Sequence, residues 1–201
     1  LAAQGVSPVA LNAEDRERPI VARLRPAASP DPITEGPRVS VLMPCWNRQD
    51  LVEMAARSIL DQSWRNLELI IVDDASTDDS WSVLRRLAAG DDRVRILRNE
   101  VNLGPYVGKN LALTQATGSY ITGHDADDWA HPDRIARQVR FCMDNDQPAC
   151  LSGMLRVDPA GHFVRFNDIG GNVHDGACRS AFISLMVQAQ VLHSGFGFWD
   201  E

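Results

Sequence analysis

Short strand-forming runs alternate with amphipathic stretches between residues 38 and 146, and the alternation repeats four times. The runs cover residues 39–43, 67–72, 94–97 and 119–123, and the short apolar run at 39–43 is typical of a strand that is buried on both faces. After each run, apolar residues recur at helical spacing, which predicts a helix. Regular alternation of strand and helix predicts an α/β fold with a mostly parallel sheet flanked by helices.

Local signals predict where these elements begin and end. We expect Pro44 to end the first strand. Asp50 followed by Glu53 is typical of a capping box at the start of the first helix. Ser76 can cap the second helix, and Pro105 suits the first turn of the third. The third strand is short, so we expect it nearer the edge of the sheet.

The two ends of the chain depart from this pattern. Residues 1–37 hold six of the eleven prolines, and we interpret them as an extension or linker that lies over a domain or leads in from another one. Residues 149–157 and 162–166 flank a turn, which predicts a hairpin, and residues 181–187 form a further strand-like run. A mixed or antiparallel portion should therefore follow the parallel sheet.

The chain reads as a piece of a longer protein. It starts at Leu1 without a methionine, and residues 195–201 are rich in aromatic side chains, which is unusual for a natural terminus. We therefore expect one domain over residues 38–201 that is cut short at its C-terminus.

Composition narrows the class of protein. The 201 residues suit one globular domain with an extra segment, and a 44% apolar and 23% charged content is ordinary for a soluble protein. A net charge of -7 argues against a general nucleic-acid binder. Because no apolar run reaches about 18 residues and no signal-peptide core is present, we expect no spanning helix. The four cysteines form no CxxC pair, which favours free thiols in a reducing compartment and suggests a cytoplasmic protein.

Polar residues gather directly after three of the predicted strands, at residues 46–48, 73–74 and 125–128. In a parallel sheet the ligand binds outside the carboxyl ends of the strands. Asp125 and Asp127, two positions apart at the end of a buried strand, can both reach one hard metal ion. An isolated acidic segment of this kind is more often a solvated turn. Three such strand ends at one edge favour a ligand site.

Four segments in the same order and spacing resemble the family-2 glycosyltransferases. Residues 39–47 (VSVLMPCWN) are similar to the family's VSVIxPxYN opening, with Trp46 in place of the usual tyrosine. Residues 69–78 (LIIVDDASTD) resemble EiIiVDDgStD, and residues 102–110 resemble N.G...aRN, with Lys109 where arginine is common. Residues 120–128 resemble yi.flDaDD.

The resemblance extends over about residues 38–145. Residues 132–135 match the helix start that follows the acidic segment in that family, and residues 194–201 resemble its GgFDE or GfWDe segment. No GxGxxG or GxxxxGK[ST] motif is present, which disfavours dehydrogenase and P-loop folds.

The resemblance implies a glycosyltransferase-A fold, a Rossmann-like sheet that binds a nucleotide sugar. It implies metal-dependent transfer of a sugar from a nucleotide-diphosphate donor, expected to be a UDP-sugar, to an acceptor hydroxyl with inversion. The acceptor would be a saccharide, a lipid-linked group or a protein in polysaccharide or glycoconjugate synthesis. No nucleic-acid partner is expected, and peripheral association of a parent protein with a membrane stays open.

By the same resemblance, Asp74 contacts the ring NH of uracil and Trp46 stacks on the base. Asp127 binds Mn²⁺ or Mg²⁺ together with the diphosphate, and the metal neutralises the leaving group. Asp125 lies by the ribose and the metal waters, and Lys109 faces the nucleotide or its phosphates. The implied nucleotide-sugar-binding residues are Pro44, Trp46, Asn47, Arg48, Asp74, Lys109, Asp125 and Ala126, and the implied metal ligands are Asp127 and Asp125.

The catalytic base of an inverting transfer is a carboxylate that deprotonates the acceptor hydroxyl. The resemblance places it beyond Glu201, with Asp200 and Glu201 as lesser candidates whose expected role is structural. His124 is either a packed strand-end residue or an addition to the metal site. Trp129 and Trp199 are either rim residues of the pocket or packed side chains.

Three other functions stay open at this point. A phosphatase of the haloacid-dehalogenase type also carries a DxD motif, but it uses the first Asp as a nucleophile and normally places the motif on the first strand. A non-catalytic domain could serve the assembly of a larger glycan-synthesis protein. A nucleotidyltransferase would prefer a glycine-rich loop after the first strand.

Overall fold

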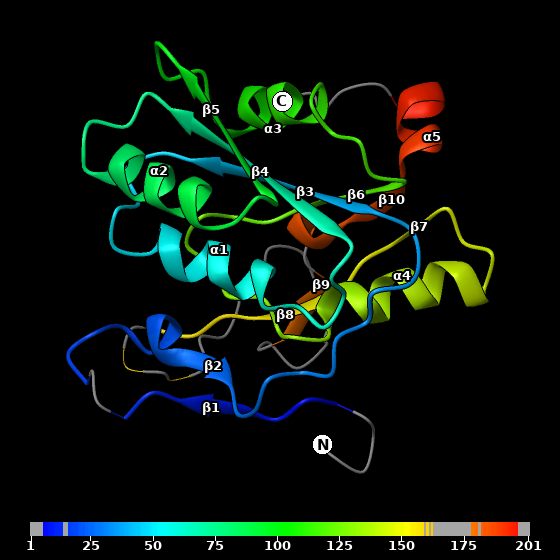
Figure 1. Ribbon diagram of the computed structural model, residues 1–201, viewed down its shortest axis with the longest axis horizontal. Helices are drawn as coiled ribbons and strands as arrows, with labels where there is room; N and C mark the ends of the chain where they lie inside the picture. Colours follow the sequence, from blue (N-terminus) through cyan, green and yellow to red (C-terminus); the bar gives the residue numbers. More distant parts are fainter. Residues whose placement is uncertain are drawn as a thin grey trace, which may run out of the picture.

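The computed structural model describes residues 6–13, 16–158, 160, 162, 178–180 and 182–196. A six-stranded sheet runs through the middle of the molecule, with helices on both faces (Figure 1). Its strands are, in sheet order, β5 (Val94–Asn99), β4 (Leu67–Asp74), β3 (Val39–Cys45), β6 (Tyr120–Gly123), β10 (Met186–Gln188) and β7 (Ala149–Cys150).

The sheet is parallel in its first four strands and antiparallel at its other end. β3 pairs in parallel with both β4 and β6, and β4 pairs in parallel with β5. β10 lies between β6 and β7 and is antiparallel to both. The structure therefore confirms the mostly parallel α/β sheet with a mixed C-terminal portion, and β5 lies at the edge as expected.

Two hydrophobic clusters, one on each face, hold the helices on the sheet. β3 and β4 are buried at every position, so their side chains point alternately into the two clusters. Val41 and Met43 pack in the cluster with α1 and α2, whereas Leu42 and Ile70 pack in the cluster with α3. The helices are α1 (Val52–Leu60), α2 (Ser80–Gly90), α3 (Pro105–Leu113), α4 (Arg134–Asp144) and the short α5 (Ala189–Val191).

Pro44 does not end the first strand, because β3 continues through it to Cys45. The backbone of Leu42 faces β6, since its carbonyl oxygen accepts a hydrogen bond from His124 N at 3.0 Å. Pro44, two residues on, faces the same side, and β6 has already ended at Gly123. The missing N–H of Pro44 therefore costs no ladder hydrogen bond.

The predicted caps of the first two helices are also wrong. α1 begins at Val52 with Leu51 as its N-cap, and Leu51 makes no capping bond through its side chain in the described structure. α2 begins at Ser80, and Ser76 instead accepts a hydrogen bond on its Oγ from Asn47 N at 2.9 Å. Pro105 does occupy the first turn of α3, as predicted.

A buried carboxylate joins the strands at their amino ends. Glu68 is 1% exposed, and its Oε1 accepts hydrogen bonds from Ser40 Oγ at 2.6 Å, Thr117 N at 2.7 Å and Thr117 Oγ1 at 2.8 Å. Burial alone would raise the pKa of Glu68, but these hydrogen bonds and the charge of Arg38 outweigh it and lower the pKa. The ionised form of Glu68 is therefore part of the folded structure.

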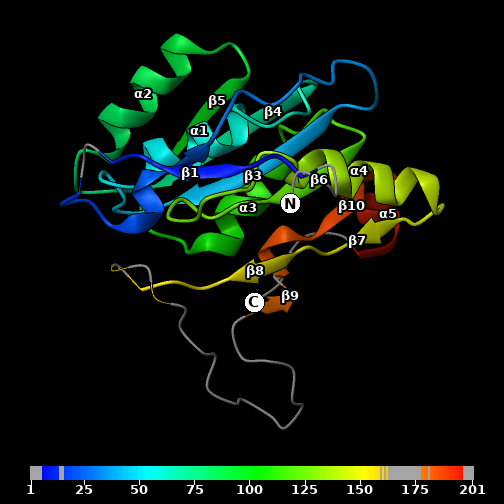
Figure 2. The same ribbon diagram turned by 90° about the horizontal axis from the view of Figure 1, so that it is seen from below.

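After α4 the chain leaves the main sheet. β8 (Gly153–Leu155) pairs antiparallel with β9 (Cys178–Ser180), and the two form a separate ribbon (Figure 2). Asp158 N donates a hydrogen bond to His162 O at 2.9 Å, which closes the turn predicted there. The first arm expected of that hairpin, residues 149–157, instead forms β7, which pairs with β10, and β8, which pairs with β9. Residues 163–166, the expected second arm, lie outside the described residues. The predicted strand over 181–187 is a 3-10 helix, Phe182–Ser184, followed by β10.

The N-terminal segment, defined here as residues 6–37, lies over α1 (Figure 1). It contains the antiparallel pair β1 (Val9–Leu11) and β2 (Leu24–Pro26), joined in part by a 3-10 helix, Ile20–Arg23. At its far end, Ile33 forms a β-bridge with Trp64, and Trp64 Nε1 donates to Pro37 O at 3.1 Å. Gly36 passes this ring with a φ of +123°, and a Cβ there would lie 2.3 Å from Trp64 Cη2.

In the part of the chain that the structure describes, no helix is both long enough and apolar enough to cross a bilayer.

Candidate active site

Two tight turns bring the ends of β3 and β4 together. Asn47 and Ala75, which follow those strands, both have positive φ values, 51° and 57°. Asn47 Oδ1 accepts a hydrogen bond from Thr77 N at 2.9 Å, while Asn47 N donates to Ser76 Oγ at 2.9 Å. Asparagine tolerates the left-handed conformation, and here its side chain also joins the two turns.

The carboxylate of Asp74 holds the start of α3. Asp74 is 2% exposed, and Asn99 Nδ2 donates to its Oδ1 at 2.7 Å. The backbone N–H of Leu103 bridges both oxygens at 3.0 and 3.1 Å, and Gly104 N donates to Oδ2 at 2.7 Å. These bonds fill the roughly four lone-pair sites of a carboxylate, so a base N–H could bind Asp74 only by displacing one of the donors.

Asp73 points to the opposite face of the sheet and is fully buried. Arg98 Nε lies 3.0 Å from Asp73 Oδ2, but no donor among the described residues meets either oxygen in hydrogen-bond geometry. Arg98 also lies over the Trp81 ring, 5.1 Å from its centroid, and donates to Ser76 O at 3.0 Å. Arg98 thus balances the charge of Asp73, a role that the sequence pattern did not indicate.

The acidic segment after β6 meets two cations from other elements. Lys109 Nζ, on α3, lies 3.8 Å from Asp125 Oδ1, and Arg48 Nε, in the loop after β3, lies 3.0 Å from Asp127 Oδ2. The Lys109 side chain is 12% exposed, whereas those of Arg48 and Asp127 are 43% and 42% exposed. Three elements far apart in the sequence therefore bring charged groups to one place.

Burial, and after it the neighbouring negative charges, raise the pKa values of Asp125 and Asp128. Burial raises the pKa of Asp125, and the negative charge of Asp127 adds to this, while Lys109 opposes both. Burial and the charges of Asp125 and Asp127 raise the pKa of Asp128 to about 6, although Arg134 opposes them. Burial lowers the pKa of Lys109, and Asp125 partly restores it. A further cation would relieve this repulsion.

His124 is a packed residue whose two ring nitrogens are both in use. Arg134 Nη1 lies 3.2 Å from Nδ1, and an arginine can only donate, so Nδ1 accepts. The proton is then on Nε2, 3.4 Å from Ser58 Oγ, which accepts it. Burial and the charge of Arg134 lower the pKa of His124 to about 3. His124 therefore stays neutral and does not face the carboxylates as a metal ligand.

Arg134 is the residue at this edge that sequence reasoning missed. It begins α4 and is partly buried, and the loss of hydration around its guanidinium lowers its pKa to about 10, although the charge of Asp128 opposes this. Its Nη2 donates to Thr122 Oγ1 and to Gly123 O, both at 2.7 Å. Arg134 thus fixes the end of β6, from which the acidic segment projects.

The remaining predicted residues differ in how deeply they are buried. Pro44 and Ala126 are buried, and Trp46 stands 52% exposed beside the end of β3. Trp64 is buried and Trp81 packs against the core, so both serve packing. Trp129 is partly exposed and contacts His131 edge to face. Trp199, Asp200 and Glu201 lie outside the described residues.

The donor atoms at this edge suit a hard divalent cation, because they are carboxylate oxygens. Within the described ranges, no three His, Cys, Asp or Glu side chains gather in a metal-binding group. Asp125 and Asp127 could hold such an ion only with further oxygen ligands from water or from a bound substrate.

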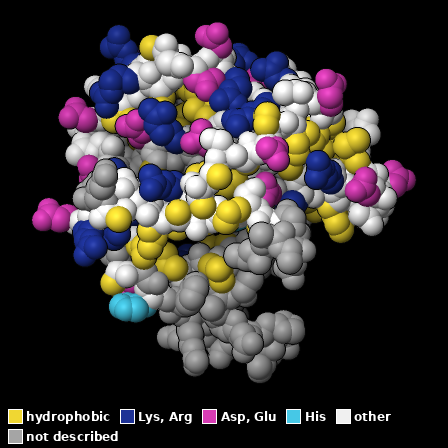
Figure 3. All heavy atoms as spheres, turned by 60° about the horizontal axis from the view of Figure 1, so that its bottom comes forward, with side chains coloured by type: hydrophobic (Ala, Val, Ile, Leu, Met, Phe, Trp, Pro, Cys, Tyr) yellow, Lys and Arg dark blue, Asp and Glu magenta, His cyan; other side chains and the backbone are white. Residues whose placement is uncertain are grey.

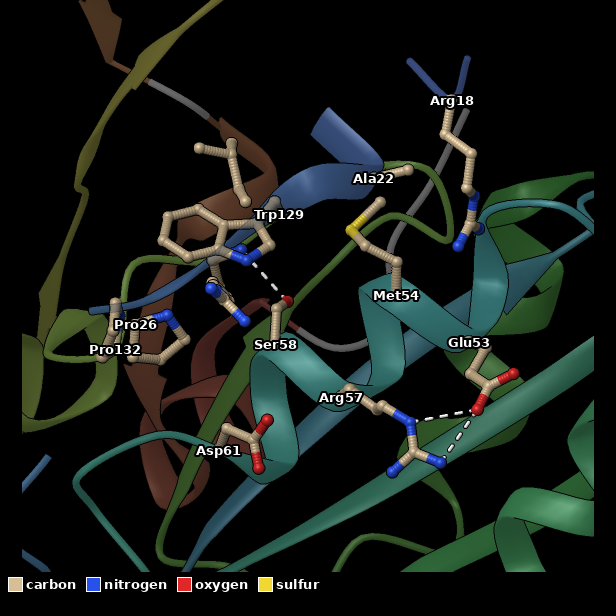
Figure 4. A pocket seen from close by; sticks show the side chains of 13 residues that line it. Arg18, Ala22, Pro26, Glu53, Met54, Arg57, Ser58, Asp61, Trp129 and Pro132 are labelled. Carbon is tan, nitrogen blue, oxygen red and sulfur yellow. Dashed lines mark hydrogen bonds and ion pairs between the residues drawn. The ribbon is translucent and has the colours of Figure 1, made fainter. Parts of the chain in front are cut away.

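A separate pocket of about 350 Å³ lies between the N-terminal segment and α1 (Figure 4). Trp129 and Ala130, which directly follow the acidic segment, form part of its wall. The other lining residues are Arg18, Ala22, Leu24, Arg25, Pro26, Glu53, Met54, Arg57, Ser58, Asp61 and Pro132. On the face of the molecule in Figure 3, side chains of both charge signs are interspersed.

Comparison with known proteins gives a family match. The family model described as "Glycosyl transferase family 2" matches residues 40–175. The putative teichuronic acid biosynthesis glycosyltransferase TuaG of Bacillus subtilis is 39% identical over 117 residues, which are 58% of this chain and 46% of that protein. This chain spans about half the length of the first curated relatives that it matches.

Solved structures match as well. The mannosyltransferase PcManGT from Pyrobaculum calidifontis, solved in complex with GDP-Man and Mn²⁺, is 33% identical with a TM-score of 0.52, and the match covers 61% of this chain and 37% of that one. Staphylococcus aureus TarS, residues 1–349 in complex with UDP-GlcNAc, has a TM-score of 0.60 at 18% identity, covering 81% of this chain and 48% of that one. The second likeness supports the glycosyltransferase-A fold alone.

Proposed function

This chain belongs to glycosyl transferase family 2, and on that premise we propose that it transfers a sugar from a nucleotide-diphosphate donor to an acceptor hydroxyl. The proposed donor is a UDP-sugar, and the proposed product is a polysaccharide or glycoconjugate. The transfer would depend on Mn²⁺ or Mg²⁺ and would invert the anomeric centre. TuaG is named for teichuronic acid biosynthesis, and PcManGT was solved with a nucleotide sugar and Mn²⁺. The first supports a role in glycan synthesis, and the second supports a nucleotide-sugar donor and a divalent metal but not UDP in particular.

The observation that carries the proposal is the pairing of two carboxylates with two cations at the end of β6. Asp127 and Asp125 would hold the divalent ion, which when bound supplies a Lewis acid for the departing diphosphate. Arg48 and Lys109, which now lie beside these carboxylates, are placed to meet diphosphate oxygens instead. The site would thus exchange internal ion pairs for contacts with the donor.

The nucleoside would lie beside the ends of β3 and β4. Trp46 offers an exposed indole for stacking on the base, and Asn47 fixes the turn that carries it. Asp74 would accept the ring N–H if the Asn99 amide gives up its bond at 2.7 Å. Pro44 and Ala126 would form the buried floor of the site.

Activation of the acceptor hydroxyl is assigned to a carboxylate. The proposed base is an acidic residue beyond Glu201, with Asp200 and Glu201 as lesser candidates. The acceptor stays open between a saccharide, a lipid-linked group and a protein.

Cytoplasmic location is part of the proposal. The three cysteines whose side chains are described, Cys45, Cys142 and Cys150, are free thiols, as expected in a reducing compartment.

Calorimetric titration with UDP, with and without Mn²⁺, tests the donor site. We expect binding that requires the metal, loss of that binding in Asp127→Ala, and normal binding in Asp144→Ala, which removes an exposed carboxylate at the far end of α4. Titration with GDP shows whether the base is recognised. Absence of metal-dependent binding of either nucleotide to the unaltered chain would refute the proposal. Release of phosphate from p-nitrophenyl phosphate would favour the phosphatase alternative.

A further inference from the structure

The pocket between the N-terminal segment and α1 is not explained by donor binding. One wall comes from residues 18–26, and the family match begins only at residue 40. The opposite wall comes from α1 and from Trp129 and Ala130. Its volume of about 350 Å³ is within the range of small-molecule sites. The site is thus built by an addition to the family domain.

The N-terminal segment is tied to the domain on both sides of this pocket. Ser7 N and Oγ donate to the two oxygens of Asp133 at 2.7 and 3.0 Å, before the start of α4. Arg18 Nη2 donates to Asp50 O at 3.1 Å, before the start of α1. Ile33 N donates to Ser63 O at 2.7 Å, beyond the end of α1. These anchors hold the wall of the pocket in place.

The lining combines an aromatic surface with planar charged groups of both signs. The indole of Trp129 and the side chain of Met54 are both among the lining side chains drawn in Figure 4. Arg57 Nε and Nη2 donate to the same oxygen of Glu53, Oε1, at 3.0 and 2.8 Å, so Glu53 Oε2 can accept from a ligand. Arg25 and Asp61 have no side-chain partner among the described residues.

This set of groups matches the chemistry of a pyranose ring. Such a ring has an apolar C–H face, which packs on an indole, and a rim of hydroxyls that both donate and accept hydrogen bonds. Arg25 can donate to hydroxyl oxygens, and Asp61 and Glu53 can accept from hydroxyl protons. A simple anion would need cations alone, but two carboxylates face three arginines here.

The pocket is connected to the acidic segment through the chain itself. Trp129 directly follows Asp128 and is two residues from Asp127. Ala130 N donates to Ser58 Oγ at 3.1 Å, which attaches the Trp129 turn to α1. A sugar held on Trp129 would therefore be close to the carboxylates at which transfer takes place, and such positioning lowers the entropic barrier to reaction.

We propose that this pocket binds a sugar ring of the acceptor, stacked on Trp129 and hydrogen-bonded to Arg25, Asp61 and Glu53. This inference rests on the proposed function, because the pocket is an acceptor subsite only if the chain is a transferase. It assigns the acceptor to the saccharide class and gives the N-terminal segment a role in recognising it.

The test uses the 201-residue chain and trisaccharides of glucose, N-acetylglucosamine and glucuronic acid as probes, with binding measured by calorimetry and saturation-transfer NMR. At least one probe should bind, and Trp129→Ala should weaken that binding at least tenfold. Arg25→Ala, on the exposed N-terminal wall, should do the same without risk to the core. Arg16→Ala, an exposed arginine of the same segment outside the pocket, should change nothing.

UDP titration in the presence of Mn²⁺ separates the two proposals. If UDP binds but no trisaccharide does, or if trisaccharide binding survives both substitutions, the sugar subsite is refuted and the proposed function stands. If a trisaccharide binds with the expected pattern but neither UDP nor GDP binds, the proposed function is refuted and the acceptor role of the pocket falls with it. Trisaccharide binding that both substitutions weaken, together with UDP binding that Arg25→Ala leaves unchanged, supports the subsite.

Discussion

Replacing Lys109 is the most direct test of the proposed contact between this site and a diphosphate. Lys109 Nζ lies 3.8 Å from Asp125 Oδ1 and the side chain is 12% exposed. At that distance, with an effective dielectric constant of about 20, the Coulomb attraction is about 4 kcal/mol, and burial of the ammonium offsets part of it. Hydrogen bonds to charged groups contribute about 1.5–3 kcal/mol net.

In the proposed complex the metal neutralises Asp125, and Lys109 donates to the diphosphate instead. Lys109→Met removes that donor but keeps a side chain of similar length and apolar character. We therefore expect the Kd for UDP at saturating Mn²⁺ to rise by about 10- to 150-fold, since about 1.4 kcal/mol corresponds to a factor of ten. Lys109→Arg keeps the positive charge and should stay within about threefold of the unaltered chain.

Calorimetric titration of the three proteins with UDP checks this, and a thermal melt of each confirms folding. A Kd for Lys109→Met within threefold of the unaltered chain would show that Lys109 does not meet the nucleotide. If Lys109→Arg lost as much affinity as Lys109→Met while staying folded, the charge would not be the cause.

Two further predictions concern the fold that holds the site. Glu68→Gln should destabilise the chain by about 2 kcal/mol in urea unfolding, because it replaces a buried carboxylate that accepts three short hydrogen bonds. The pKa of Glu68 is lowered in the folded chain, so the ionised carboxylate stabilises the fold at neutral pH, and this stabilisation is lost as the pH falls through the folded pKa. If Glu68→Gln remained less stable than the unaltered chain below that pKa, the ionised carboxylate would not be the cause. Gly118→Ala should destabilise by at least about 2 kcal/mol, since its Cβ would lie 2.6 Å from Ser40 N and 2.9 Å from Arg38 O. Gly90→Ala is the matched control: nothing lies within 4 Å of that Cβ, so thermal melting should show a change of less than about 1 kcal/mol.

The parallel part of the sheet could be predicted because its signal is local. β3 and β4 are buried at every position, so their sequences are mostly apolar, with Ser40 and Glu68 as the interruptions before the strand ends. The position of Pro44 could not be predicted, because it depends on where β6, a different strand, ends. The insertion of β10 between β6 and β7 is likewise set by pairing between distant residues and leaves no periodic pattern.

The candidate site divides in the same way. The acidic segment and the Trp46–Arg48 loop stand out because polar residues follow apolar runs, and the structure brings Asp127 and Arg48 to 3.0 Å. Arg134 reads in the sequence as an ordinary charge at the start of a helix. Its hydrogen bonds to Thr122 and Gly123 depend on the start of α4 lying next to the end of β6. Asp74 reads as a free ligand, although the turn before α3 occupies both of its oxygens.

The place of β10 between β6 and β7 has a consequence for how the chain folds. β3, β4, β5 and β6 can pair as they leave the ribosome, but the free edge of β6 stays open until residues 186–188 are made. β7 is made earlier and has no partner in the sheet until β10 arrives. Pairing over such long separations is slow, and an open strand edge invites association between chains. We therefore expect nascent chains that are stalled before residue 186 to aggregate or to stay bound to chaperones. Chains that include β10 should be released from the chaperones.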